Sequence, residues 1–188
     1  MKTLFSLSPL DYDGKQLRSH FSYDHFGLLG NSCVAFIGAC QVDLDNMVDL
    51  EDVHNNAPIY SPSMLHFILE NYDFSLLEAI LFQRLMVVNI HEELQQQGIQ
   101  GLSREGDDLY DLQNQTKKKL SVSIAAPSPV SQLIHIGLNI LTEGTPVPTV
   151  GLKNWEINLE SFAQNCLTRF QIEESSIRKA SYKVKGLN

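Results

Sequence analysis

The chain has 188 residues, of which 43% are hydrophobic and 19% charged, so we expect one globular domain over residues 1–188 with a substantial core. Its formal net charge of −8 argues against nucleic acid as the main partner, because phosphate backbones bind to basic surfaces. No apolar run approaches the ~20 residues of a membrane span, and three widely spaced cysteines give no disulfide framework, so we expect a cytoplasmic protein without a membrane partner.

The first part of the chain predicts strands separated by polar connections. Residues 2–7 (KTLFSL) are a candidate first strand, and residues 14–29 carry apolar side chains at a spacing that suggests a helix. Residues 32–42 are apolar and β-branched enough for a buried strand, and residues 63–70 (SMLHFILE) form a second one. The acidic stretch at 43–58 is expected to be a loop.

The clearest predicted helix follows Ser75. Ser75 and Glu78 have the spacing of a capping box, and Gly98 is a natural stop. The helix is apolar around much of its circumference near residues 76–88, which suggests that a partner chain covers one face. We therefore expect a homodimer.

The second part of the chain predicts a hairpin, a further strand and a closing helix. Residues 107–112 and 119–125 form the hairpin with a longer loop, and residues 131–141 form the next strand. From Leu159 to Phe170 the apolar residues have helical spacing. Strands outnumber helices, so the predicted class is α+β, with a mostly antiparallel sheet flanked by helices.

The strands at 119–125 and 131–141 each have one aliphatic face and one face of small and polar residues. We expect the two polar faces to align into a groove for a small-molecule ligand. An antiparallel sheet that simply wets one face is the alternative, although small residues favour something packing close. The residues on these faces are Lys119, Ser121, Ser123 and Ala125 in the first strand, and Leu133, His135, Gly137 and Asn139 in the second.

Other charged residues supply candidate ligands. Asp107 and Asp108 could hold Mg²⁺ through one or two carboxylates, although adjacent aspartates are also common in turns. Arg104 beside them, or Arg18 with His20, would suit phosphate or carboxylate binding; an exposed helix face explains the latter pair equally well. The chain has no P-loop, no dinucleotide-binding glycine motif and no nucleophile elbow.

Several sequence blocks resemble an uncharacterised family, the domain of unknown function family 366. In chain order they are YDGKQLRSHF, VAFIGACQV, MVDLEDV, MLHFILE, REGDDLYD, KKLSVSIAAPSPVS and IHIGLNI. The resemblance covers nearly the whole chain. It implies no activity.

A more distant resemblance is to the catalytic domain of biotin and lipoate protein ligases, which is related to class II aminoacyl-tRNA synthetases. The stretch KLSVSIA is similar to a ligase strand whose lysine contacts the acyl-adenylate, so the resemblance gives Lys119 that role. The chain departs from the ligases at Val122, where they have glycine, and it lacks their RRxSGGG signature; APIYSPSM takes its place.

Two functions are compatible with these residues. The first is an enzyme that activates a small carboxylic acid with ATP and Mg²⁺, or transfers an acyl group. Lys119 would stabilise developing charge and His135 would orient substrate or move a proton. The second is a domain that binds a nucleotide or metabolite without catalysis. In both, the candidate binding residues are Arg18, His20, Arg104, Ser121, Ser123 and Asn139, with Asp107 and Asp108 for the metal.

Overall fold

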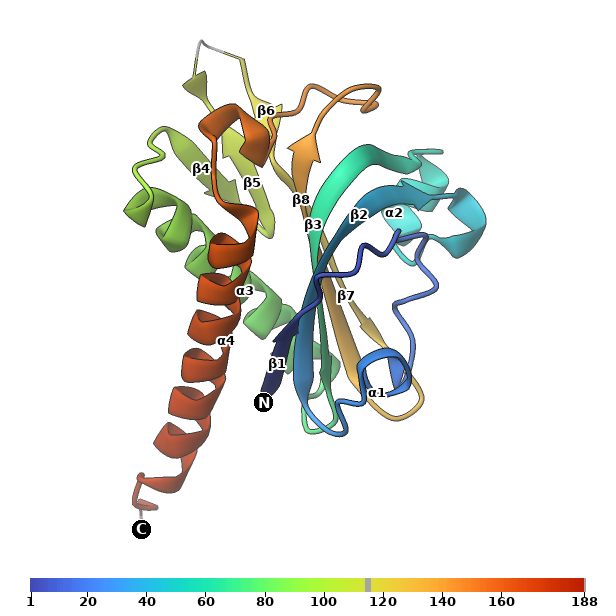
Figure 1. The fold of residues 1–188 in the computed structure, drawn as a ribbon. Helices are drawn as coiled ribbons and strands as arrows, with labels where there is room; N and C mark the ends of the chain where they lie inside the picture. Colours follow the sequence, from blue (N-terminus) through green and yellow to red (C-terminus); the bar gives the residue numbers. More distant parts are fainter. Residues whose placement is uncertain (114–115, 188) are drawn as a thin grey trace.

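The computed structural model describes residues 1–113 and 116–187. Five strands form the main sheet in the order β1-β2-β3-β8-β7, and only the β1–β2 pair is parallel. The predicted α+β class with a mostly antiparallel sheet is confirmed (Figure 1). The strands of this sheet are β1 (Lys2–Phe5), β2 (Ser32–Val42), β3 (Ile59–Asn71), β7 (Ser121–Pro127) and β8 (Gln132–Leu141).

A second, three-stranded sheet consists of β4 (Leu102–Glu105), β5 (Asp108–Asp111) and β6 (Lys118–Lys119). The predicted hairpin of residues 107–112 with 119–125 is mostly wrong: β5 pairs only with the two residues of β6, and residues 121–127 pair with β8 in the main sheet instead. The chain passes from one sheet to the other at Leu120, whose N–H donates to the Leu109 carbonyl at 2.8 Å. Lys119 therefore belongs to the small sheet, and the next residue but one begins the large sheet.

Two long helices, α3 (Leu76–Gln96) and α4 (Leu159–Tyr182), cover one face of the main sheet (Figure 1). The predicted capping box is confirmed: the Ser75 hydroxyl accepts from the Glu78 N–H at 3.3 Å, and the Glu78 carboxylate accepts from the Ser75 N–H at 2.6 Å. The larger core lies between these two helices and the sheet, and the aliphatic face of β8 packs into it. The β8 residues in this core are Ile134, Ile136, Leu138 and Ile140.

The opposite face of the sheet is covered by the segment that follows β1. The N–H groups of Leu10 and Tyr12 donate to carbonyls of β2 at 3.0 and 2.8 Å. Gly38 permits this crossing, because a Cβ atom there would overlap the Leu10 carbonyl. A smaller core forms on this face around Phe21, Phe36 and Met64.

Short helices complete this second face. They are α1 (Phe21–Phe26), α2 (Leu50–His54) and the 3-10 turn at Leu44–Asn46; another 3-10 turn, Leu152–Trp155, precedes α4. The helix predicted over residues 14–29 is thus mostly wrong. Positive φ angles at Gly14 (92°), His20 (62°) and Gly27 (66°) confine helical backbone to six residues.

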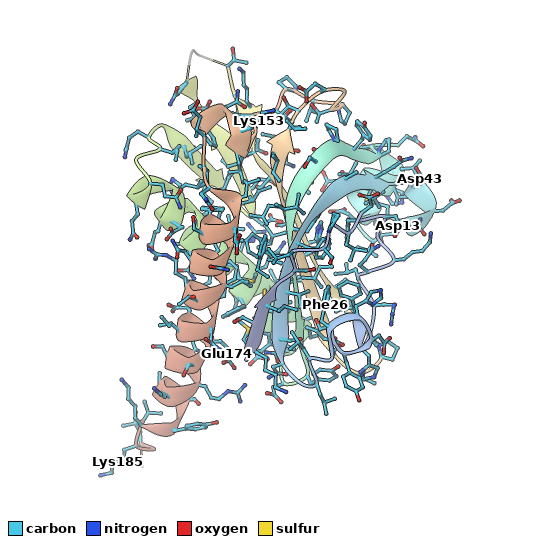
Figure 2. The ribbon with its side chains drawn as sticks, in the orientation of Figure 1. Asp13, Phe26, Asp43, Lys153, Glu174 and Lys185 are labelled. Atoms are coloured by element: carbon cyan, nitrogen blue, oxygen red, sulfur yellow. The ribbon has the colours of Figure 1, made fainter. Side chains whose placement is uncertain are left out.

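The long helix α4 carries Glu174, which is labelled among the side chains in Figure 2. Its carboxylate accepts a hydrogen bond from the amino group of Met1 at 3.0 Å, which holds the start of β1 against the helix.

No helix within residues 1–113 and 116–187 combines the length and the apolarity that crossing a membrane requires. Cys33, Cys40 and Cys166 are buried and have free thiols.

Candidate functional site

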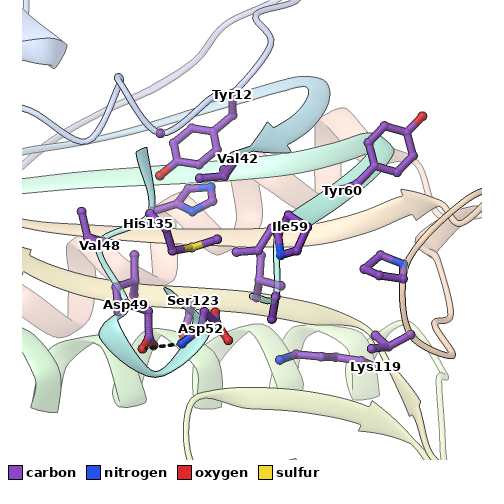
Figure 3. Close-up of a pocket in the computed structure, with 18 of the residues that line it drawn as sticks. Tyr12, Val42, Val48, Asp49, Asp52, Ile59, Tyr60, Lys119, Ser123 and His135 are labelled. Carbon is purple, nitrogen blue, oxygen red and sulfur yellow. Dashed lines mark hydrogen bonds between the residues drawn. The ribbon is translucent and has the colours of Figure 1, made fainter. Parts of the chain in front are cut away.

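A cavity of about 600 Å³ lies on the face of the main sheet that α3 and α4 leave free. Strands β7 and β8 contribute to its lining, as do residues 46–52, residues 145–149 and the turn of the β4–β5 hairpin (Figure 3). Pockets that hold small organic ligands typically have volumes of roughly 300–1,000 Å³. The cavity is therefore the candidate site.

His135 lines the cavity and is 3% exposed. Its Nε2 lies 3.0 Å from Nδ1 of His66, whose own Nε2 lies 3.4 Å from the Gly38 carbonyl oxygen. A carbonyl oxygen only accepts, so His66 donates from Nε2 and accepts at Nδ1, and His135 donates from Nε2. The network thus assigns one tautomer to each ring.

Burial keeps this histidine pair neutral. Desolvation lowers the pKa of His66 from 6.5 to about 4. It also lowers the pKa of His135 far below 6.5, and the neighbouring His66 contributes in the same direction. His66 is thus a fully buried histidine with both ring nitrogens bonded, and one of its partners is the histidine of the cavity.

Tyr12 stacks on His135, with ring centroids 3.8 Å apart and planes at 13° (Figure 3). The phenol is 4% exposed, and burial raises its pKa well above 10. A neutral aromatic ring therefore holds the imidazole from above, while His66 holds it in the plane of its hydrogen bond.

Asn139 lies on the same face of β8 as His135, two residues beyond Gly137, and lines the cavity. Its Nδ2 donates to the Lys119 carbonyl at 3.4 Å, while its buried Oδ1 has no hydrogen-bond partner among the residues that the structure describes. A buried acceptor without a donor is costly, so this atom is of interest for ligand binding.

Lys119 is the one lysine or arginine among the described residues that line the cavity. Its ammonium lies 2.8 Å from the Asp108 carboxylate, which also accepts from the Tyr110 hydroxyl at 3.2 Å. Burial raises the pKa of Asp108, and the Lys119 ammonium opposes that shift. The same burial, with Asp108 nearby, raises the pKa of Tyr110 to about 12. Lys119 is therefore held in a fixed ion pair.

Asp107 connects the hairpin to α3 and β7. Its carboxylate accepts from Gln83 Nε2 and from the Ser123 hydroxyl, both at 2.9 Å, and lies 3.3 Å from the Arg84 guanidinium. Both aspartates proposed for Mg²⁺ thus already have protein partners. No group of three or more histidine, cysteine or carboxylate side chains within the described part of the chain has the arrangement of a metal site.

Further carboxylates line the cavity on and beside α2. Asp49 caps this helix, its side chain accepting from the Glu51 N–H at 2.8 Å and from the Asp52 N–H at 3.4 Å (Figure 3). Burial raises the pKa of Asp52, and Asp49 adds to the shift while Lys119 opposes it. Five carboxylates thus line the cavity against a single lysine: Asp49, Glu51, Asp52, Asp107 and Asp108.

The structure brings together Lys119, Asp107, Asp108, Ser123, His135 and Asn139, all of which line the cavity. It does not bring Arg18, His20 or Arg104 to them. Arg18 forms an exposed ion pair with Asp24 at 2.7 Å, His20 contacts the Tyr72 hydroxyl at 2.9 Å, and Arg104 donates to the Gly106 carbonyl. Since none of the three lines the cavity, we remove them from the candidate site.

The expected alignment of the two polar strand faces is wrong. Val122 pairs with Gly137 and Ile124 with His135, so these two residues of β7 share the cavity face. The side chains of Ser121 and Ser123 lie on the other face of the sheet, with Leu138 and Ile136. Ser123 still contributes to the cavity lining, but its hydroxyl is bonded to Gln83 and Asp107. The Ser121 hydroxyl accepts from the Leu109 N–H at 2.8 Å, which holds the small sheet to the large one.

Sequence reasoning missed three kinds of lining residue. Tyr12 reaches the site only because its segment crosses β2, and no local pattern signals that crossing. Met64 lies in the predicted strand at residues 63–70, but nothing in that strand's sequence indicates that its side chain points into a cavity. Asp49 and Asp52 lie in the stretch 43–58, which is expected to be a loop but contains α2; an aspartate followed by acidic residues in a first turn is the helix-start signal for this helix.

The chain belongs to the family described as Domain of unknown function (DUF366), which matches residues 1–185. A relative from Methanocaldococcus jannaschii, "Uncharacterized protein MJ0805", is 36% identical over 160 residues, covering 82% of this chain and 70% of the relative. A solved "Protein of Unknown Function from Pyrococcus horikoshi" is 40% identical, with a TM-score of 0.92 over 100% of both chains.

Solved ligases are similar in fold at low identity. A biotin protein ligase from Aquifex aeolicus in complex with biotin and ATP has a TM-score of 0.57 and 12% identity, over 90% of this chain and 68% of the ligase. A bi-partite lipoate protein ligase from Thermoplasma acidophilum has a TM-score of 0.50 and 13% identity, over 92% of this chain and 82% of that one. The resemblance in fold to biotin and lipoate ligases is confirmed.

Proposed function

We propose that this member of the DUF366 family binds a small carboxylic acid in the cavity and activates it with ATP and Mg²⁺. The observation that carries the proposal is the position of Lys119. It lines a cavity of ligand size in a ligase-like fold, and Asp108 holds its ammonium 2.8 Å away. A fixed cation at a reacting centre stabilises the charge that develops there.

The similar fold supports the choice of reactants. The Aquifex aeolicus ligase was solved with biotin, which is a carboxylic acid, together with ATP. In the proposed reaction, a carboxylate oxygen of the acid attacks the α-phosphorus of ATP. The bond from that phosphorus to its bridging oxygen breaks, pyrophosphate leaves, and an acyl-adenylate forms. Lys119 stabilises the negative oxygens, and His135 orients the acid from the floor of the cavity.

Mg²⁺ has a specific part in this proposal. Five carboxylates line the cavity, so a bare triphosphate would be repelled. Mg²⁺ commonly binds through one or two protein carboxylates together with substrate phosphates. Asp107 and Asp108 are the carboxylates we propose for it, next to Lys119. The bound ion would shield the phosphates from the attacking carboxylate.

Thermal unfolding with and without Mg-ATP tests the nucleotide half of the proposal. At ~100 times its dissociation constant, a ligand specific for the folded state stabilises it by about 2.7 kcal/mol, or several degrees for this size. We expect this shift for the wild type and for Lys153→Ala, an exposed control lysine away from the cavity, but not for Lys119→Ala. Equal shifts in all three proteins would remove Lys119 from the site.

A second candidate function is binding of a nucleotide or metabolite without catalysis. The excess of carboxylates over Lys119 favours it, because such a lining suits a cationic or donor-rich ligand better than a phosphate. Pyrophosphate release separates the two functions. A candidate acid that stabilises the protein but releases no pyrophosphate with Mg-ATP would support binding alone.

We also propose that the functional form is a homodimer. Leu77 and Leu81 are one turn apart on α3 and are 66% and 61% exposed. A second copy covering this stripe would remove it from water. Light scattering after gel filtration should give twice the mass of 21.2 kDa, and Leu77→Ser should reduce it to the monomer. A wild-type monomer at all concentrations would refute the dimer.

A further inference from the structure

The end of α4 extends beyond the rest of the fold. The helix contributes buried side chains as far as Glu174, and none of residues 175–187, the α4 tip, is buried. From Glu174 to the end of the helix at Tyr182 the backbone rises by about 12 Å, since each helical residue adds about 1.5 Å. Figure 2 shows Lys185 at the far end of this extension, away from the sheet. The α4 tip therefore does not contribute to the core.

The α4 tip is basic, although the whole chain has a formal net charge of −8. It contains four lysine or arginine residues and no carboxylate. Arg178 is neutralised by ion pairs with Glu174 at 2.8 Å and with Asp73 at 2.9 Å. The other three cations are exposed and form no ion pair with any residue that the structure describes: Lys179, Lys183 and Lys185. Their charge is available to an external anionic surface.

Apolar side chains are interspersed among these lysines. Tyr182 and Val184 are each 73% exposed, and Leu187 is fully exposed. Ile177 lies seven residues, or two turns, after the buried Phe170 on the same side of α4, yet it is 47% exposed. Neighbouring large apolar groups in water mark a surface that binds something. The α4 tip thus combines unpaired positive charge with exposed apolar area.

We propose that the α4 tip binds to the surface of an anionic lipid bilayer. The lipid phosphates attract the three unpaired lysines, while the apolar side chains enter the boundary between head groups and acyl chains. Lysine stems can lie along apolar surface and still keep their ammonium groups at the level of the phosphates. The expectation of no membrane partner follows from the lack of a spanning segment, which surface binding does not require.

The length of the extension makes this binding compatible with an acidic protein. Solvent-exposed charges are largely screened beyond a Debye length, which is ~8 Å at physiological ionic strength. With α4 upright on the bilayer, the ~12 Å rise of the helix beyond Glu174 holds the other carboxylates farther away than that. Nucleic acid also offers phosphates, but it would leave Val184 and Leu187 in water. The bilayer accommodates both the charge and the apolar area.

Co-sedimentation with lipid vesicles tests the proposal. We expect the wild type to sediment with vesicles of equal parts phosphatidylglycerol and phosphatidylcholine, and to stay in solution with phosphatidylcholine alone. Raising the ionic strength from about 0.01 M to about 1 M shortens the Debye length from ~30 to ~3 Å and should release most of the protein. Equal binding to the two kinds of vesicle, or no binding to either, would overturn the inference.

Two triple variants of equal net charge separate the α4 tip from the overall charge. The tip variant carries Lys179→Gln, Lys183→Gln and Lys185→Gln. The control carries the same change at three exposed lysines elsewhere, Lys15, Lys117 and Lys153. Each lysine near an anionic surface tightens binding about fivefold, so the tip variant should bind the anionic vesicles roughly a hundredfold more weakly, whereas the control should resemble the wild type. Equal losses in the two variants would overturn the inference.

A further variant tests the apolar half of the surface. Val184→Ser combined with Leu187→Ser keeps every charge and should weaken binding to the anionic vesicles about tenfold. Unchanged vesicle binding would mean that phosphate groups alone are recognised. Tighter wild-type binding of a short DNA duplex than of vesicles, at equal phosphate concentration, would assign the α4 tip to nucleic acid. A lower mass of the tip variant in light scattering would assign it to a second copy. Each of these three results would overturn the inference.

Discussion

Lowering the pH from 7 to 5 should destabilise the folded chain, because His66 and His135 are buried as neutral rings. In the unfolded chain a histidine binds a proton near pH 6.5, whereas in the fold the pKa of His66 is about 4. The unfolded state therefore takes up protons first as the pH falls. The stability that the neutral pair contributes is complete above pH 6.5 and is lost progressively toward pH 4.

The two pKa values of His66 set the size of the effect. A shift of 2.5 units (6.5 − 4) corresponds to about 3.4 kcal/mol in full, of which roughly 2 kcal/mol is lost between pH 7 and pH 5. His135 shifts in the same direction and adds to the loss. The free energy of unfolding should thus fall by a few kcal/mol over two pH units.

Urea unfolding at pH 7, 6 and 5 measures this slope. His66→Gln should unfold with a shallower pH dependence than the wild type, since one of the two neutral rings is gone. His54→Gln is the matched control, because His54 is exposed at the end of α2. The free energy of unfolding of this variant should fall with pH as steeply as that of the wild type. Parallel wild-type and His66→Gln curves between pH 7 and 5 would refute the assignment of buried neutral histidines.

Two further substitutions test how the site is supported. Gly38→Ala should lower the free energy of unfolding in urea by about 1–3 kcal/mol or more, because the new Cβ overlaps the Leu10 carbonyl. Gly186→Ala is the control: it has open space around it and should leave the unfolding midpoint unchanged. Equal midpoints for the two variants would show that the segment crossing β2 shifts to accept the Cβ at no cost. Ser75→Ala should cost about 1 kcal/mol by removing the acceptor for the Glu78 N–H, and a loss below the error of the measurement would mean that the capping box contributes nothing to α3.

Periodicity predicted the sheet better than it predicted the site. The alternation in β8 was sufficient, because Ile134, Ile136, Leu138 and Ile140, which it placed on one face, all enter the core under α3 and α4. In β7 the alternation of polar and apolar residues did not identify the ligand face. The hydroxyls of Ser121 and Ser123 instead form hydrogen bonds with the small sheet and with α3. Val122 and Ile124 then form apolar floor in the cavity. A polar strand face therefore marks a hydrogen-bonded interface as readily as a ligand site.

The members of the candidate site differ in how far sequence could find them. Lys119, His135 and Asn139 stand out because they are polar residues next to aliphatic runs. His66 does so as well, but only the register of β3 against β8, which pairs Ile68 with His135 and His66 with Gly137, reveals that the two rings can meet. Register and chain crossings are set by the whole fold, so local patterns do not contain them.

The junction at Leu120 has a consequence for how tightly any ligand can be held. A free lysine side chain loses roughly 1.5–2 kcal/mol of rotamer entropy when it is fixed. Lys119 is already paired with Asp108 before any ligand arrives, and its backbone is hydrogen-bonded at Pro148, while Leu120 is bonded to Leu109. Much of that entropy is therefore lost during folding instead of during binding. Substitutions that loosen this seam between the sheets should therefore weaken binding even when they leave every residue that contacts the ligand in place.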